Sequence, residues 1–113
     1  MSSTELQQLE LSIKHSQKTV DLGDALERLR NNRDFKKVIG EAYFNEEAVR
    51  LVHLMSDSNM QAPELQQSIH KQMIAIGVFH EFLNNLAIRA GMARRSIAAD
   101  EATRDEILAE GGE

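Results

Sequence analysis

The side chains best suited to metal binding or proton transfer are the four histidines of this sequence, His15, His53, His70 and His80. His70 and His80 fall on one predicted helix but lie ten residues apart. Two ligands on one helix face are usually four residues apart, or three apart in a Glu-x-x-His pair. The sequence contains neither pattern. We therefore predict that the chain holds no helical zinc or di-iron site.

The sequence contains no recognisable pattern for nucleophilic catalysis either. The chain has no cysteine, which excludes thiol nucleophiles, thiolate ligands and disulfides. It also lacks a Gly-x-Ser-x-Gly elbow and a glycine-rich phosphate loop. Ser68 and His70 are close in sequence, but two residues on a helix point to different sides. We predict that the protein is not an enzyme and binds no cofactor.

A basic run between residues 28 and 37 is the strongest case for ligand chemistry. It holds five cations against one acid, Asp34, and phosphate binding would require several of the cations on one surface. The whole chain has a net charge of −5, whereas nucleic-acid binders usually present a large basic face. We expect a solvated face that offsets the acidic remainder or pairs with the acidic tail of another copy. The possible phosphate contacts are Arg30, Arg33, Lys36 and Lys37.

The composition describes the scaffold that must carry these groups. Of 113 residues, 42% are hydrophobic but only 4% are aromatic, so aliphatic side chains must fill the core. A single proline and abundant Ala, Leu, Glu, Gln and Arg favour helices. We predict one all-α domain over residues 1–113. The N-terminus has no apolar signal region, and no apolar run reaches the ~18 residues that span a membrane.

The first half of the chain is predicted to consist of short helices. Residues 1–20 form an N-terminal helical arm, in which leucines and isoleucine recur at three- and four-residue steps. The rhythm slips at residues 21–24, where Gly23 weakens a helix by ~1 kcal/mol relative to alanine. We expect a turn or a kink there, followed by a short-helix cluster over residues 24–56.

Two asparagine positions are predicted to divide this cluster. Asn31 and Asn32 are predicted to end a helix, and Asn45 is predicted to be an N-cap. Glu46 and Glu47 would then lie at the positive end of the new helix dipole. The sequence Asp-Ser-Asn at positions 57–59 is expected to end that helix.

Residues 63–110 are predicted to form one long helix with an acidic end, starting at Pro63, where proline is favoured. A helix of ~45 residues would be ~68 Å long, which exceeds the size of a compact chain with a radius of gyration of ~13 Å. It must pack against a partner helix from this chain or another copy. The short-helix cluster should cover residues 65–87, and residues 88–110 could pair with the N-terminal arm within or between chains.

The fold class is therefore predicted to be an all-α helical hairpin or bundle that forms a coiled-coil-like homo-oligomer. We predict that an apolar seam on the long helix is the oligomer or partner interface, and that charged residues set partner choice. The predicted interface consists of Ile69, Met73, Ile76, Phe79, Leu83, Leu86 and Ile97 with Arg89, Arg94 and Arg95, followed by the acidic tail of Asp100, Glu101, Asp105, Glu106, Glu110 and Glu113.

Three segments in the middle of the chain resemble small helical proteins of tailed bacteriophages. They are LGDALERL at residues 22–29, DFKKVI at 34–39 and EEAVRLVHL at 46–54. The resemblance extends over residues 20–110, is carried by hydrophobic and structural positions, and transfers no functional residues. It implies a virion component or assembly factor that binds itself and larger phage structural proteins. Such a protein would act in the host bacterial cytoplasm during assembly, and its retention in the virion is left open.

The leading prediction is thus a non-enzymatic phage virion or assembly protein, with a structural, scaffolding or chaperone role, that acts through helix–helix contacts. Two alternatives come from other classes. One is a small inhibitor of a host enzyme or defence complex, with an acidic surface that imitates nucleic acid. The other is a DNA-binding packaging factor that uses the basic run.

Overall fold

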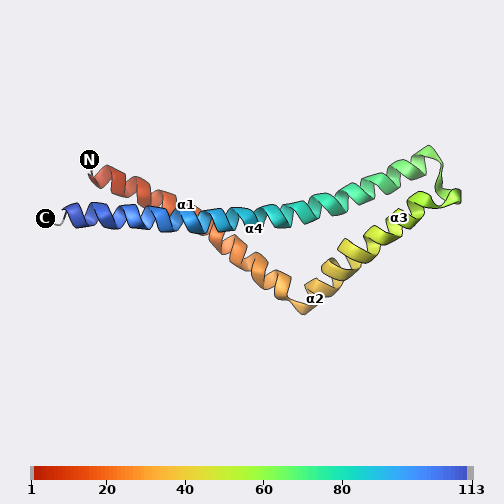
Figure 1. Cartoon of the computed structure of the whole chain (residues 1–113), viewed down its shortest axis with the longest axis horizontal. Coiled ribbons are helices and arrows are strands. Elements are labelled where there is room, and N and C mark those ends of the chain that lie inside the picture. The colour runs from red at the N-terminus through yellow and green to blue at the C-terminus, as the bar shows by residue number, and fades with distance from the viewer. Residues whose placement is uncertain (1, 112–113) are drawn as a thin grey trace. The chain divides into compact units, whose positions relative to one another are not determined.

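The computed structural model describes residues 2–111, which are almost wholly helical and contain no strand (Figure 1). This confirms the prediction of an all-α chain with one long C-terminal helix. Glu113 of the predicted acidic tail lies outside the described residues. In chain order the elements are α1 (Ser2–Asn31), α2 (Arg33–Phe35), the π-helix η1 (Lys36–Glu47), α3 (Ala48–Ser56), the 3₁₀-helix η2 (Ser58–Met60) and α4 (Pro63–Gly111).

The long helix α4 begins where it was predicted to begin. Pro63 is its first residue, a position where the missing proline N–H has no intrahelical acceptor to lose. The first turn closes when the Gln66 amide donates to the Ala62 carbonyl at 3.0 Å. No proline follows, and the helix continues through Gly77 and Gly91 to Gly111.

Two predicted helix stops are confirmed, and each is built from a short polar side chain. Asn32 has extended backbone angles (φ −69°, ψ 130°), and its side chain accepts from the Phe35 amide at 3.0 Å. Asp57 is also extended (φ −71°, ψ 128°) and accepts from the Asn59 amide at 2.8 Å. Both side chains satisfy amides that have no acceptor inside the helix.

The expected break at residues 21–24 is absent, because α1 runs unbroken from Ser2 to Asn31. Gly23 is buried inside this helix, and a Cβ at Gly23 would overlap the Cβ of Ala90 on α4. The glycine therefore permits a close approach of two helices. Its packing role offsets the cost of glycine in a helix interior, so residues 24–31 belong to the first helix.

The predicted N-cap at Asn45 is wrong. Phe35, Lys36, Glu47 and Ala48 all have right-handed helical angles, so residues 33–56 form one helical run, and Asn45 is an exposed position within it. A residue at an N-cap has extended angles instead. No proline or glycine turn interrupts the run, and an exposed asparagine costs a helix only a fraction of a kcal/mol, about 0.7 at most.

The middle of this run is wound as a π-helix of 12 residues. Val38 and Glu47, nine residues apart, would be two and a half turns apart in an α-helix of about 3.6 residues per turn. In a π-helix of roughly 4.4 residues per turn they are about two turns apart. The wider winding thus brings both residues to the same side of η1.

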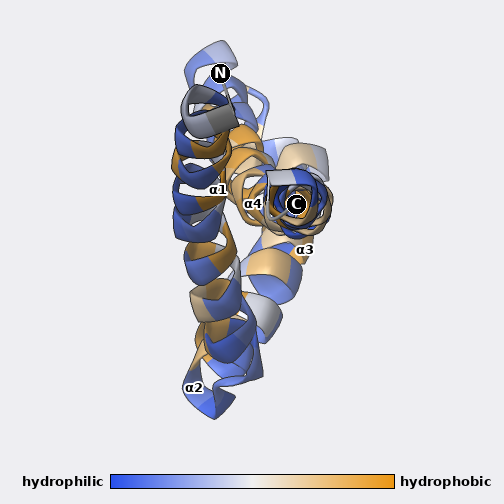
Figure 2. Cartoon of the chain, turned by 90° about the vertical axis from the view of Figure 1, so that its left-hand side faces the viewer, coloured by the Kyte–Doolittle hydropathy of each residue, from blue (hydrophilic) through white to orange (hydrophobic). Residues whose placement is uncertain are grey.

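The chain divides into two compact units, residues 2–26 with 85–111, and Glu27–Asn84. In the first unit α1 and α4 pair in antiparallel fashion, because Ser12 hydrogen-bonds Asp100 at 2.7 Å whereas Asp24 pairs with Arg94 at 2.6 Å. In Figure 2 the apolar residues of α1 lie on its side toward α4. The N-terminal segment and the end of α4 therefore pair within one chain.

The seam of this first unit repeats at three- and four-residue steps, as in a coiled coil. Side chains of modest size predominate where the helices are closest. Its buried members are Val20, Gly23, Leu26, Leu86, Ala90 and Ala93, and its half-buried members include Leu6, Leu9, Ile13, Ile97 and Ile107.

The second unit has an aliphatic core between α3 and α4. Leu51 is fully buried and packs with Ile69 and Ile76. Gln66 holds the connection between the two helices, because its side-chain amide donates to the carbonyls of Met60 at 2.7 Å and Met55 at 3.1 Å. Of the cluster over residues 24–56 that was expected to pack on residues 65–87, residues 43–54 do so, whereas Leu26 belongs to the first unit. The half-buried residues around the core are Tyr43, Phe44, Ala48, Leu54, Met60 and Met73.

No helix within residues 2–111 combines the length and the apolar character that a membrane crossing requires.

Candidate protein-interaction site

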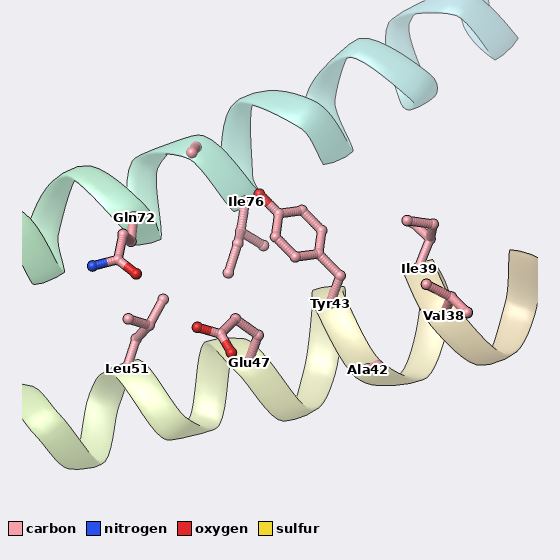
Figure 3. Close-up of a pocket in the computed structure, with 9 residues that line it drawn as sticks. Val38, Ile39, Ala42, Tyr43, Glu47, Leu51, Gln72 and Ile76 are labelled. Atoms are coloured by element: carbon pink, nitrogen blue, oxygen red, sulfur yellow. The ribbon is translucent and has the colours of Figure 1, made fainter.

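An open apolar groove lies in the second unit, between the run formed by η1 and α3 and the facing part of α4. Its volume is ≈ 520 Å³. Figure 3 shows Tyr43, Glu47 and Leu51 pointing toward Gln72 and Ile76 of α4. The residues that line it are Val38, Ile39, Ala42, Tyr43, Glu47, Leu51, Gln72, Ala75 and Ile76.

Two features of the facing helices create this groove. The π-helical winding of η1 brings Val38 and Glu47 to one side, although they lie nine residues apart. Ala42 and Ala75 contribute only methyl groups from the two facing helices, so space remains above Leu51. The result is a groove between helices, and most of the residues that line it are aliphatic.

The groove carries little polar chemistry. Of the nine described residues that line it, only Glu47 is charged. Arg50 donates to both carboxylate oxygens of Glu47, with Nε at 3.0 Å from Oε2, and these hydrogen bonds lower the pKa of Glu47 and raise that of Arg50. The Gln72 side-chain amide already donates to Ser68 at 3.3 Å. Such a surface is suited to apolar side chains with one carboxylate at the edge.

The structure places most of the predicted interface seam inside a single chain. Ile69, Ile76, Leu83 and Leu86 are buried, and Met73 and Ile97 are half-buried. Of the seam, Phe79 keeps the most exposure at 36%, and its ring packs edge-on against Tyr43. Contact of these residues with another molecule stays a prediction. Their visible role is packing within the chain.

The three predicted arginines differ in their surroundings. Arg94 forms the ion pair with Asp24, while Arg89 and Arg95 are exposed on α4. In the acidic tail, Asp100 accepts the hydrogen bond from Ser12, so one acid is engaged within the first unit. Charge in this region thus contributes to pairing of α1 with α4.

An exposed apolar stripe on α4 was not recognised from the sequence. Ile74, Val78 and Phe82 are 50%, 58% and 53% exposed, and they recur at four-residue steps. Ile74 and Val78 each lie two residues from the buried Ile76, which corresponds to ~200° around a helix. The sequence does contain this second helical period, but the apolar side predicted for the helix does not include these three residues.

Three of the four predicted phosphate contacts come together. Arg33, Lys36 and Lys37 surround a hollow of ≈ 340 Å³ together with Asn31 and Glu41. The fourth residue, Arg30, instead donates to the Asn84 side chain at 3.0 Å. The basic run therefore forms a small cationic hollow at the start of the second helical run.

The histidines are exposed and scattered over the described chain. His80 lies edge-on to the Phe44 ring at 4.9 Å between centroids, and its Nδ1 is 3.1 Å from the Asn84 amide nitrogen. Residues 2–111 contain no group of three or more histidine, aspartate and glutamate side chains placed to hold a metal ion.

Comparisons with protein families, curated proteins and solved structures gave no match to this chain.

Proposed function

We propose that this protein is a non-enzymatic assembly component that works through helix–helix contacts. The sequence resemblance favours a tailed phage as the setting, with a structural, scaffolding or chaperone role. The observation that carries the proposal is the open apolar groove of the second unit. We propose that this groove receives an amphipathic helix from a larger structural subunit.

Shape and charge favour a helix as the occupant. A helix lays anchors from successive turns into a groove of this kind, and the small side chains of Ala42 and Ala75 leave room for them. Glu47 is the one charged residue among the nine described residues that line the groove. We therefore expect the bound helix to carry aliphatic anchors and a basic residue that meets Glu47.

The proposal can be tested by filling the groove in the phage that carries this gene. Ala75→Trp places an indole in the hollow, whereas Ala102→Trp adds the same group at an exposed position of α4. We expect Ala75→Trp to lower the yield of infectious particles toward the level seen after deletion of the gene, and Ala102→Trp to leave it unchanged. Normal particle yield after deletion would overturn the proposal.

The cationic hollow supports a second candidate function, binding of a nucleic-acid backbone during packaging. Arg33, Lys36 and Lys37 meet around one hollow, as phosphate contacts must. Replacing all three by alanine should abolish retardation of duplex DNA at low salt. The matched control replaces three other exposed cations, Lys14, Lys18 and Arg89. Absence of DNA retardation by the native protein at low salt would remove this candidate.

A further inference from the structure

We infer that a second copy of this chain docks on the exposed face of α4 between Lys71 and Glu81, as an antiparallel, two-fold symmetric helix pair. The inference deepens the proposed function, on which it rests, by naming one helix partner. It uses a different side of α4 from the buried core residues Ile69 and Ile76.

The order of residues on this face is complementary to itself when reversed. Lys71, Ile74, Val78 and Glu81 are all exposed and are separated by three, four and three residues, so they lie along one side of the helix. An antiparallel copy presents the same spacing in reverse. Lys71 then meets Glu81 of the second copy, and Ile74 meets Val78 of the second copy. Each contact occurs twice, as an isologous interface requires.

Both charged ends of this face are available for such a contact. Within residues 2–111 the ion pairs are Glu47–Arg50, Asp24–Arg94 and Arg104–Asp105, so neither Lys71 nor Glu81 is engaged in one. The two residues cannot pair within their own helix, because ten residues correspond to ~15 Å of axial rise. A second copy brings the opposite charges together at both ends of the apolar pair.

Gly77 leaves room for a close approach on this face. It follows Ile74 by three residues and precedes Glu81 by four, so it lies on the same side of α4. A Cβ at Gly77 would meet no atom within 4 Å, whereas a Cβ at Gly23 would overlap Ala90. Nothing around Gly77 within the chain requires a glycine. The backbone of a second helix can approach where the side chain is missing.

Phe82 extends the apolar area beside this face. It is 53% exposed and follows Val78 by four residues. The apolar contact is nevertheless small compared with the ~1,200 Å² that stable protein interfaces bury. We therefore expect weak, concentration-dependent pairing, in which the two charge contacts set the register and orientation.

Charge reversal tests the pairing directly by sedimentation equilibrium over a range of protein concentrations. Lys71→Glu and Glu81→Lys each place like charges opposite one another, and each should raise the dissociation constant about tenfold. The double variant K71E/E81K restores opposite charges and should recover the native constant. Lys18→Glu, an exposed lysine of α1, is the control with the same change in charge.

Two results would overturn the inference. One is a native protein that stays monomeric at its highest soluble concentration. The other is a dimer whose dissociation constant ignores the single reversals or is not restored by the double variant. All substituted positions are exposed, and unchanged helical circular dichroism would show that the variants fold.

Cysteine cross-linking tests the register separately, because the native chain has no cysteine. Ile74→Cys and Val78→Cys proteins, mixed in equal amounts and oxidised, should give mainly the mixed disulfide dimer. Preferential linking of identical variants would contradict the antiparallel register.

The two proposals fail separately. The pairing face and the groove use different residues, so a native protein that stays monomeric while Ala75→Trp still lowers particle yield removes only the inferred dimer. An Ala75→Trp protein that pairs normally and also supports normal particle yield removes only the role of the groove.

Discussion

The two units of the chain use the same long helix in different ways. In the first unit, Gly23 and Ala90 bring α1 and α4 close together, and polar contacts flank the seam. In the second unit, larger side chains such as Leu51 and Ile76 form the core and a groove stays open beside it. Small residues therefore let the two helices of the first unit pack closely. In the second unit they leave an open groove, which we propose receives a partner.

The two parts of α4 therefore differ in role, one pairing with α1 and the other leaving apolar surface exposed. Asp24 and Ser12 contact Arg94 and Asp100, which fixes the register of the first unit through pairs far apart in sequence. The second unit keeps its apolar groove and the exposed stripe at Ile74, Val78 and Phe82. Interaction with other molecules is thus proposed for the second unit, and four substitutions test how distinct the units are.

The largest expected effect is loss of the second unit's core. Leu51→Ala removes a fully buried side chain, and buried Leu→Ala substitutions usually lower the free energy of unfolding by about 2–5 kcal/mol. Thermal or urea unfolding followed by circular dichroism measures the change. Val49→Ala, two residues away at an exposed position, is the control and should stay within about 0.5 kcal/mol of native stability. Equal effects of the two substitutions would contradict the described core.

The next effect concerns the close helix approach in the first unit. Gly23→Ala adds a methyl group that overlaps Ala90, and overpacking of this kind lowers the free energy of unfolding by about 1–3 kcal/mol. The double variant G23A/A90G removes the overlap and should recover part of the loss. Chemical denaturation of the two variants measures both changes. A stabilised Gly23→Ala protein would show that the two helices are farther apart than described.

A smaller effect of opposite sign is expected at Gly77. Alanine there meets no atom of the chain within 4 Å, and Gly→Ala in an open helix interior raises the free energy of unfolding by about 0.5–1 kcal/mol. Unfolding at low protein concentration, where two copies do not pair, measures the change in the free energy of unfolding of the monomer alone. A destabilised monomer would show an intramolecular contact at Gly77.

The smallest effect is the pH dependence of the stabilisation that the Glu47–Arg50 pair contributes at the groove edge. Hydrogen bonds from Arg50 lower the pKa of Glu47 below its ordinary value of 4.5. The folded-state pKa lies below the unfolded value, so the stabilisation is complete above the unfolded pKa and is lost as pH falls through the folded pKa. NMR titration of the Glu47 carboxyl should show the lowered pKa, and Arg50→Ala should return it toward 4.5. An unchanged pKa in Arg50→Ala would exclude the pair as its cause.

Local signals in the sequence were sufficient for much of the fold. Pro63, Asn32 and Asp57 mark helix ends through effects within one turn, so their positions could be predicted. Gly23 could not be interpreted, because its role depends on Ala90, 67 residues away. A glycine that breaks a helix and a glycine that admits a neighbouring helix look alike in sequence.

The candidate site was less accessible to prediction. The groove depends on the π-helical winding of η1, which places Val38 and Glu47 together although an α-helical period separates them. The seam through Ile69 and Ile76 was recognised as apolar, but sequence alone did not decide whether it would be covered by the chain itself or by a partner. The convergence of Arg33, Lys36 and Lys37 followed directly from their closeness in sequence.

The groove also exists only while η1 keeps its π-helical winding. If residues 36–47 rewound as an α-helix, Val38 and Glu47 would move to opposite sides and the hollow would lose one wall. An occupant would hold the segment in its wide form and oppose the rewinding, since it binds only that form. Slower exchange of the backbone amide hydrogens across this segment would therefore report that the groove is filled.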